Sequence, residues 1–208
     1  MLKAIFFDWG STFVNEFKEV RKEIENLLGP HGLSWESFFP YWGNFYYLRS
    51  KGNIKSDEEM FLQLKRVLQK ETLPVEKIRD LIIDSEIIPN ENIKIVKELK
   101  RNYKVGVISN NIKEWMEKVL VKYKIESLFD SIVISSEVGV GKPDARIFYI
   151  ALNSLSVKPE ETVFISDEIG DDLVGARGCG MKTIWLDRSS ENKWNREKEN
   201  SPIFSSQK

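Results

Sequence analysis

The chain has 208 residues, of which 41% are hydrophobic and 30% are charged, as is typical of a globular protein with a substantial core. Its 31 lysines and arginines nearly cancel its 32 aspartates and glutamates, so no overall field attracts nucleic acid or an anionic membrane. We therefore expect neither nucleic acid nor a membrane as a partner.

The single cysteine and the single histidine restrict the chemistry further. Cys179 has no second thiol for an intrachain disulfide, which fits a reducing cytoplasm. His31 alone excludes a histidine-rich zinc site, so carboxylates are the better source of chemistry, and a metal held by them would be a hard ion such as Mg²⁺. The N-terminal segment reaches Asp8 too early for a signal peptide, and the apolar runs are shorter than the roughly 20 residues of a membrane span.

A short apolar segment, residues 2–7, opens the chain and predicts a buried strand that leads directly to Asp8. Residues 16–88 then show helical periodicity, and Ser56 with Glu59 predicts a capping box at the start of one helix. Eight aromatic residues gather in one part of this stretch, where we expect them to pack in a core or a seam between domains: Trp35, Phe38, Phe39, Tyr41, Trp42, Phe45, Tyr46 and Tyr47. We interpret residues 16–88 as a helical insert after the first strand.

From residue 90 onward, helical and strand patterns alternate. The predicted helices are 91–102, 112–123, 144–155 and 171–180, and the predicted strands are 103–109, 131–135, 161–166 and 181–186. With the opening segment this makes five short apolar strands separated by helical crossovers, which predicts an α/β fold with a doubly wound parallel sheet. The polar tail, residues 189–208, is expected to be solvated or loosely attached.

Polar residues stand where four of the predicted strands end. Asp8 follows the first strand, Ser109 ends the second and is followed by Asn110, Lys142 lies ahead of the helix after the third, and Asp167 follows the fourth. In a doubly wound sheet, ligands bind beyond the carboxyl ends of the strands. A hydroxyl, an ammonium and two acids at that edge suit an anionic substrate.

These segments resemble the four motifs of the haloacid dehalogenase (HAD) superfamily of hydrolases. The resemblance rests, in motif order, on "IFFDWGSTF" (5–13), "VISNN" (107–111), "GKPDARIF" (141–148) and "VFISDEIGDDLVGARGCGM" (163–181). It covers about residues 1–14 and 90–187, and the helical insert lies where this family carries its C1-type cap. The resemblance implies a Rossmann-like catalytic core of residues 1–15 and 89–208, with residues 16–88 as the inserted cap domain.

By that resemblance Asp8 is the nucleophile, which attacks phosphorus to form an aspartyl-phosphate that water then hydrolyses. Ser109 and Lys142 are the implied catalytic partners, and the implied substrate contacts are Ser11, Thr12 and Asn110. The implied function is hydrolysis of a small phosphate ester. The implied partner is therefore a small phosphorylated molecule.

Mg²⁺ is the implied cofactor, because it removes the repulsion between a carboxylate nucleophile and a phosphate dianion. The resemblance gives it an Asp8 oxygen, the backbone carbonyl of Gly10 and the Asp167 carboxylate as ligands. Asp172 matches the second acid of the fourth motif, and the neighbouring Asp171 is its alternative. Glu168 is expected to start the following helix, where the helix dipole favours an acid.

Position 10 departs from the family's pattern. The family's phosphatases carry there a second aspartate, which protonates the leaving oxygen and later activates water, and such help is worth about 10²–10⁴-fold. Here the residue is Gly10, and Ser11 stands where the family prefers glycine. Glycine keeps the carbonyl for a metal but has no proton to give. An aryl or acyl phosphate has a good leaving group, so its hydrolysis would be slowed least by the missing acid.

Three alternatives follow from this departure. The 2-haloacid dehalogenases attack carbon with the same aspartate and use no metal, whereas the retained "SDEIGDD" (166–172) favours a metal-dependent phosphoryl enzyme. Phosphonoacetaldehyde hydrolases carry a small residue at this position and form a Schiff base on a cap lysine, for which the insert offers Lys18, Lys22, Lys51 and Lys55. The third alternative is a catalytically weak domain that binds a phosphometabolite or a protein partner.

Overall fold

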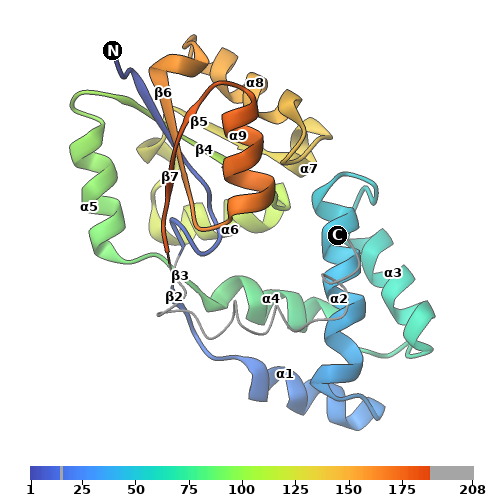
Figure 1. The fold of residues 1–208 in the computed structure, drawn as a ribbon. Coiled ribbons are helices and arrows are strands. Elements are labelled where there is room, and N and C mark those ends of the chain that lie inside the picture. The colour runs from blue at the N-terminus through green and yellow to red at the C-terminus, as the bar shows by residue number, and fades with distance from the viewer. Residues whose placement is uncertain (15, 188–208) are drawn as a thin grey trace.

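The computed structural model describes residues 1–14 and 16–187, so the expectation for the tail at 189–208 lies outside the described residues. Its centre is a parallel five-stranded sheet in the order β5-β4-β1-β6-β7 (Figure 1). The strands are β1 (Ala4–Phe7), β4 (Lys104–Ser109), β5 (Ser131–Ile134), β6 (Thr162–Ser166) and β7 (Lys182–Trp185). All five predicted strands are present, and the predicted fold class is confirmed.

Helices cover both faces of this sheet. Ile5 and Phe7 of β1 pack into one hydrophobic cluster and Ala4 and Phe6 into another, as the alternation of side chains along a strand requires. The covering elements are α5 (Asn90–Leu99), α6 (Lys113–Tyr123), α7 (Ser135–Val138), α8 (Ala145–Ser154) and α9 (Gly175–Gly178), with short turns at η2 (Glu126–Leu128) and η3 (Pro159–Glu161). Since both faces are buried, the β1 segment reads as a continuous apolar run.

The predicted helix at 171–180 differs from what is found. A π-helical turn, η4 (Ile169–Val174), precedes the short α9, so helical structure begins earlier than expected. Glu168 causes the early start, because its carboxylate accepts hydrogen bonds from the backbone N–H groups of Gly170 (2.8 Å) and Asp172 (2.9 Å). The expectation that Glu168 starts this helix is confirmed.

The chain leaves and re-enters the sheet region through a two-stranded antiparallel ribbon of β2 (Glu16–Phe17) and β3 (Glu86–Ile87). Both segments were expected to be helical, and that expectation was wrong. By pairing with each other, the two segments provide hydrogen-bond partners for backbone N–H and C=O groups that would lack them if each segment ran alone. Figure 1 shows the helices between them grouped beyond the carboxyl ends of the strands: α1 (Arg21–Leu28), η1 (Gly29–His31), α2 (Trp35–Ser50), α3 (Asp57–Leu68) and α4 (Val75–Ser85). The division into a cap of 16–88 and a core of 1–15 and 89–208 stays a prediction.

Aromatic side chains of α2 form a seam with helix α6. Trp42 is buried and stacks on Trp115, with ring centroids 5.8 Å apart, whereas Tyr41 and Tyr47 are exposed. The predicted capping box at Ser56 forms only in part: Ser56 Oγ accepts from the Glu59 N–H (3.2 Å), but the Glu59 carboxylate accepts from the Lys55 N–H instead (2.8 Å). Within 1–14 and 16–187, no helix combines the length and apolar character needed to cross a bilayer.

Candidate active site

Lys142 is the centre of a buried charge cluster at the carboxyl edge of the sheet. Its Nζ donates to Asp8 Oδ1 (2.5 Å) and to Asp172 Oδ2 (2.6 Å), and its side chain is only 3% exposed. Asp8 follows the central strand β1, Asp172 lies in η4, and Lys142 comes from the loop ahead of α8. The fold therefore brings carboxylates from two separate segments into contact with the ammonium group of a third.

The electrostatics of this cluster favour a further cation. Burial is the main influence on Asp8 and raises the pKa of its carboxyl to about 7, with Lys142 acting against this and Asp172 adding to it. Burial alone would lower the pKa of Lys142, but the carboxylates of Asp172 and Asp8 raise it above its ordinary value, so the lysine stays charged. When Asp8 is ionised, one ammonium shared by two buried carboxylates leaves a net negative charge to be neutralised.

The backbone of Lys142 is held by a clamp of two side chains. Asn110 Oδ1 accepts from the Lys142 N–H (2.8 Å) and Asn110 Nδ2 donates to the Lys142 carbonyl (3.0 Å). Lys51 Nζ, from the end of α2, donates to the same carbonyl (2.5 Å). A Cβ added at Gly141 would lie 2.6 Å from both Asn110 Oδ1 and Lys51 Nζ, so a side chain here would displace the ends of the two clamping side chains.

The loop after β1 explains the residues around Asp8. Ser11 adopts φ +58°, the left-handed region that costs least for glycine, which gives a physical reason for the glycine expected at this position. Thr12 Oγ1 donates to Asp167 Oδ1 (3.1 Å) and accepts from the Asp167 N–H (3.0 Å). Thr12 therefore positions Asp167, a role that its place in the sequence did not suggest.

The two acids at 171 and 172 have different environments. Asp172 is buried, and its Oδ2 also accepts from Ser166 Oγ (2.6 Å). Asp171 is exposed as a residue. Its carboxyl group is nevertheless partly covered, which raises the pKa of that group. Asp172 is thus the acid that faces Lys142.

Ser109 ends β4 and is buried, one strand away from Asp8 in the sheet. The structure brings Asp8, Lys142 and Asp172 into direct contact and places Asp167 at the end of the neighbouring strand β6. This arrangement of strand ends is the one expected from the four sequence motifs.

Comparison with known proteins gives the family. The sequence model of haloacid dehalogenase-like hydrolases matches residues 48–186. The chain belongs to this family. It is 30% identical over 207 residues to a glyceraldehyde 3-phosphate phosphatase of Pyrococcus furiosus, covering 89% of this chain and 80% of that protein. It is 31% identical over 196 residues to a phosphatase of the same name from Methanothermobacter thermautotrophicus, covering 88% and 85%.

Solved structures agree with the fold of this HAD-like hydrolase. A HAD family enzyme of Bacteroides thetaiotaomicron, solved in complex with magnesium and inorganic phosphate, superposes with a TM-score of 0.75. The sequences are 18% identical, and the superposition covers 95% of this chain and 99% of the other. At that identity the likeness concerns the fold alone.

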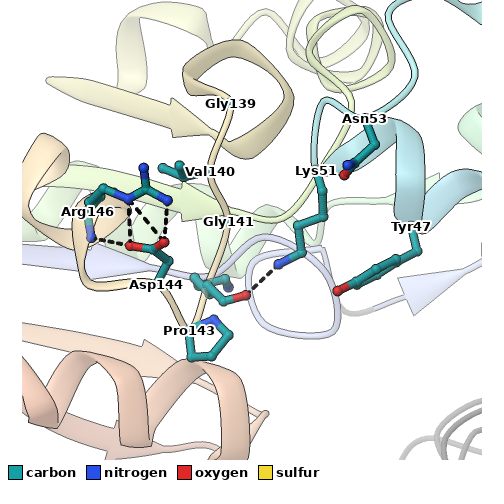
Figure 2. A pocket seen from close by; sticks show the side chains of 10 residues that line it. Tyr47, Lys51, Asn53, Gly139, Val140, Gly141, Pro143, Asp144 and Arg146 are labelled. Carbon is teal, nitrogen blue, oxygen red and sulfur yellow. Dashed lines mark hydrogen bonds and ion pairs between the residues drawn. The ribbon is translucent and has the colours of Figure 1, made fainter.

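A groove lies beside the charge cluster of the HAD core. Its volume is about 510 Å³, and it runs between the end of α2 and the loop before α8, lined among others by Tyr47, Asn53, Val140 and Arg146. Figure 2 shows Lys51 on one side pointing to the loop carbonyl, and the ion pair of Asp144 with Arg146 on the other. The groove is therefore polar on both sides.

The donors present fit Mg²⁺. Asp8 and Asp167 follow the adjacent strands β1 and β6, whose register aligns Phe7 with Ile165, so both carboxylates belong to the same edge. Among the residues that the structure describes, no three His, Cys, Asp or Glu side chains converge as a ready metal cage. Mg²⁺ accepts one or two carboxylates together with water and phosphate oxygens, so it needs no such cage.

Three residues of the insert and its ribbon contact the core, and the sequence did not single them out. Lys51 was one of four candidates for a Schiff-base lysine, and nothing in the sequence distinguished it from the other three. Tyr46 of α2 donates its hydroxyl to Asn111 Oδ1 (3.3 Å), and Glu86 of β3 accepts from the indole N–H of Trp9 (3.0 Å). These residues belong to the insert or its ribbon, and packing brings them to the core.

Proposed function

We propose that the protein is a Mg²⁺-dependent phosphatase that hydrolyses a small phosphate monoester through an aspartyl-phosphate on Asp8. The observation that carries the proposal is the contact of Lys142 Nζ with both Asp8 and Asp172 at the carboxyl edge of the sheet. A lysine in this place aligns the nucleophile and supplies positive charge for a phosphate dianion. The phosphatases among its relatives support the same reaction.

Each predicted site residue has a part in this reaction. An Asp8 oxygen attacks phosphorus in line with the leaving oxygen, while Lys142 holds the other carboxylate oxygen in place. Ser109, Ser11 and backbone N–H groups of the β1 loop take the phosphate oxygens. We assign Asn110 to the support of Lys142, because both polar atoms of its amide bind that residue's backbone.

Asp8, the carbonyl of Gly10 and Asp167 would hold the metal. A metal held there would neutralise charge on the phosphate and help to orient it for attack. Thr12 fixes Asp167 through two hydrogen bonds, so the ligand is preorganised. Asp172 already binds Lys142 and Ser166, and we assign it the positioning of the lysine at the edge of the metal shell rather than the place of a principal ligand.

Glyceraldehyde 3-phosphate is the first substrate to test, because two relatives of about 30% identity are named glyceraldehyde 3-phosphate phosphatase. Residues 16–88 would act as the cap that covers the substrate and excludes water. The groove of about 510 Å³ beside Lys51 lies at the edge of this cap. A buried free thiol at Cys179 fits a reducing, cytoplasmic setting for such an enzyme.

A second candidate is a phosphonoacetaldehyde hydrolase, and one observation favours it. Lys51 reaches the Lys142 carbonyl from α2, and burial lowers the pKa of its ammonium, as a Schiff-base lysine requires. Lys18 pairs with Glu23 and Lys55 donates to the Gly52 carbonyl, so both have partners elsewhere. Incubation with phosphonoacetaldehyde and borohydride would label Lys51 if this reaction occurs.

The deciding experiment is phosphate release from a panel of phosphate esters, phosphonoacetaldehyde and a 2-haloacid, each with Mg²⁺ and with EDTA. The proposal predicts metal-dependent release from esters that disappears in Asp8→Asn. Halide release that EDTA leaves unchanged would identify a dehalogenase. Binding of phosphate without turnover of any compound would identify a non-catalytic domain.

A further inference from the structure

The last turn of helix α2 is fixed to the core close to the charge cluster. Ser135, at the start of α7, is fully buried, and its Oγ donates to the backbone carbonyl of Ser50 (2.6 Å). The same Oγ accepts from the Asn111 N–H (3.1 Å). The last carbonyls of a helix have no partner within the helix, so the core supplies one here. The end of α2 therefore has a defined place on the core.

Lys51, the next residue, reaches from this point to the loop that carries Lys142. Its side chain is partly buried, and its Nζ donates to the Lys142 backbone carbonyl at 2.5 Å. Figure 2 shows this side chain directed at the carbonyl from its side of the groove. The anchoring of Ser50 fixes the backbone of Lys51, so only the lysine side chain has to be ordered for the bond to form.

The backbone of Lys142 is held by side chains alone. It lies between α7 and α8, in residues 139–144, which belong to neither helix. Its N–H donates to Asn110 Oδ1 (2.8 Å), and its carbonyl accepts from Asn110 Nδ2 (3.0 Å) and from Lys51 Nζ. Two donors use both lone pairs of this carbonyl, and one of the two comes from the insert.

The position of this backbone decides where the Lys142 ammonium lies. Nζ binds Asp8 Oδ1 (2.5 Å) and Asp172 Oδ2 (2.6 Å) at once, and the side chain is only 3% exposed. A closely packed side chain has little freedom to compensate for a shift of its backbone, so such a shift would lengthen one or both bonds. A displacement of about 1 Å at a reacting group can cost about 10²-fold in rate. The alignment of Asp8 thus depends on what holds the Lys142 carbonyl.

We infer that Lys51 is a positioning residue, which acts through the backbone carbonyl of Lys142 and makes the alignment of the active site depend on the docking of α2 on the core. This inference rests on the proposed function. Lys51 acts on the protein and not on the substrate, so its effect on the rate is the same for phosphate esters with unrelated leaving groups.

A loss of rate that does not depend on the substrate tests the inference. Lys51→Met keeps an unbranched apolar side chain but has no N–H to donate. We expect its kcat to fall about 10–100-fold on glyceraldehyde 3-phosphate and on p-nitrophenyl phosphate, which differ in everything beyond the phosphate, while each KM stays within about twofold of wild type. Lys51→Arg retains N–H donors but cannot form a Schiff base, and its kcat should lie within about fivefold of wild type.

A double-mutant cycle tests the dependence on the docking of α2. Ser135→Ala removes the donor to the Ser50 carbonyl, and should lower kcat about 3–10-fold on both esters. In the Lys51→Met background the same change should lower kcat less than about twofold, because the residue that transmits its effect is already absent. Lys22→Met, an exposed lysine of α1, is the matched control and should leave both rates unchanged. Melting temperatures verify that each variant folds.

The outcomes distinguish two failures. If Lys51→Met raises KM for glyceraldehyde 3-phosphate and leaves p-nitrophenyl phosphate unaffected, Lys51 is a substrate contact and the inference is wrong, although phosphatase activity stands. Unchanged rates in Lys51→Met, or equal losses in folded Lys51→Arg and Lys51→Met, would overturn it as well. If wild type releases no phosphate from either ester with Mg²⁺, the proposed function itself is wrong, and the inference falls with it.

Discussion

The carboxyl edge of the sheet and the insert contribute to the site in different ways. At the sheet edge, Asp8, Ser109, Lys142 and Asp167 stand at ends of strands or just beyond them, so the topology alone brings them together. The insert and its ribbon reach the core through Tyr46, Lys51 and Glu86, whose positions depend on how α2 and the β2–β3 ribbon pack. The first set should control whether the reaction occurs, and the second how the insert is held against the core.

The largest effect should come from the sheet edge itself. Lys142→Met removes the ammonium between two buried carboxylates, so we expect phosphate release to fall more than about 10³-fold and the free energy of unfolding to drop by about 3–5 kcal/mol. Kinetic assays and urea unfolding measure the two losses. Lys97→Met, an exposed lysine of α5, is the control. Retained activity in Lys142→Met would remove the lysine from the mechanism.

The ribbon offers a stability test that needs no substrate. The folded protein keeps a proton on Glu86 up to about pH 7, whereas the unfolded chain loses it near 4.5, so the wild-type free energy of unfolding falls as pH rises through this window. The slope is about 1.4 kcal/mol per pH unit, or about 3 kcal/mol in all. Glu86→Gln should therefore gain stability relative to wild type between pH 4.5 and 7.5. A difference between the two proteins that is constant with pH would contradict the buried environment of Glu86.

The junction between the two regions is the clamp at Gly141. Gly141→Ala places a Cβ 2.6 Å from Asn110 Oδ1 and Lys51 Nζ, which forces the clamp apart and should cost about 1–3 kcal/mol with a loss of about tenfold in kcat. Gly178→Ala, where an added Cβ meets no described atom within 4 Å, is the matched control. Equal behaviour of the two variants would mean that the loop adjusts freely.

The smallest effect should come from the seam between α2 and α6. Arg49 is 4% exposed, and its guanidinium donates to Glu114 Oε2 (2.8 Å) and lies 3.6 Å from Asp57 Oδ1. Arg49→Met should lower the free energy of unfolding by about 1–3 kcal/mol, because Asp57 loses one of its partners in a partly buried place. Arg101→Met, an exposed member of an ion pair with Glu98, should change it by less than about 0.5 kcal/mol. Circular dichroism in urea compares them.

The sequence predicted the fold and the sheet edge because short apolar strands and the residues at their ends are local signals. It did not predict the ribbon, since two-residue strands carry no periodicity, and it assigned Phe17 to a helix. Nor did it reveal that Thr12 holds Asp167 or that Asn110 holds Lys142, because each bond joins segments 32 or more residues apart. Glu86 gave no signal, since its raised pKa comes from burial and its partner Trp9 lies 77 residues away in the chain.

The central claim, a phosphoryl group carried on Asp8, is tested most directly by trapping that intermediate. The enzyme is mixed with Mg²⁺ and a phosphate ester, quenched in acid, reduced with borohydride and digested for mass spectrometry. If Asp8 carries the phosphoryl group, the peptide containing residue 8 will carry homoserine in place of aspartate, and omission of the ester will prevent the change. An unmodified Asp8 under turnover conditions, with phosphate released at the full rate, would contradict it.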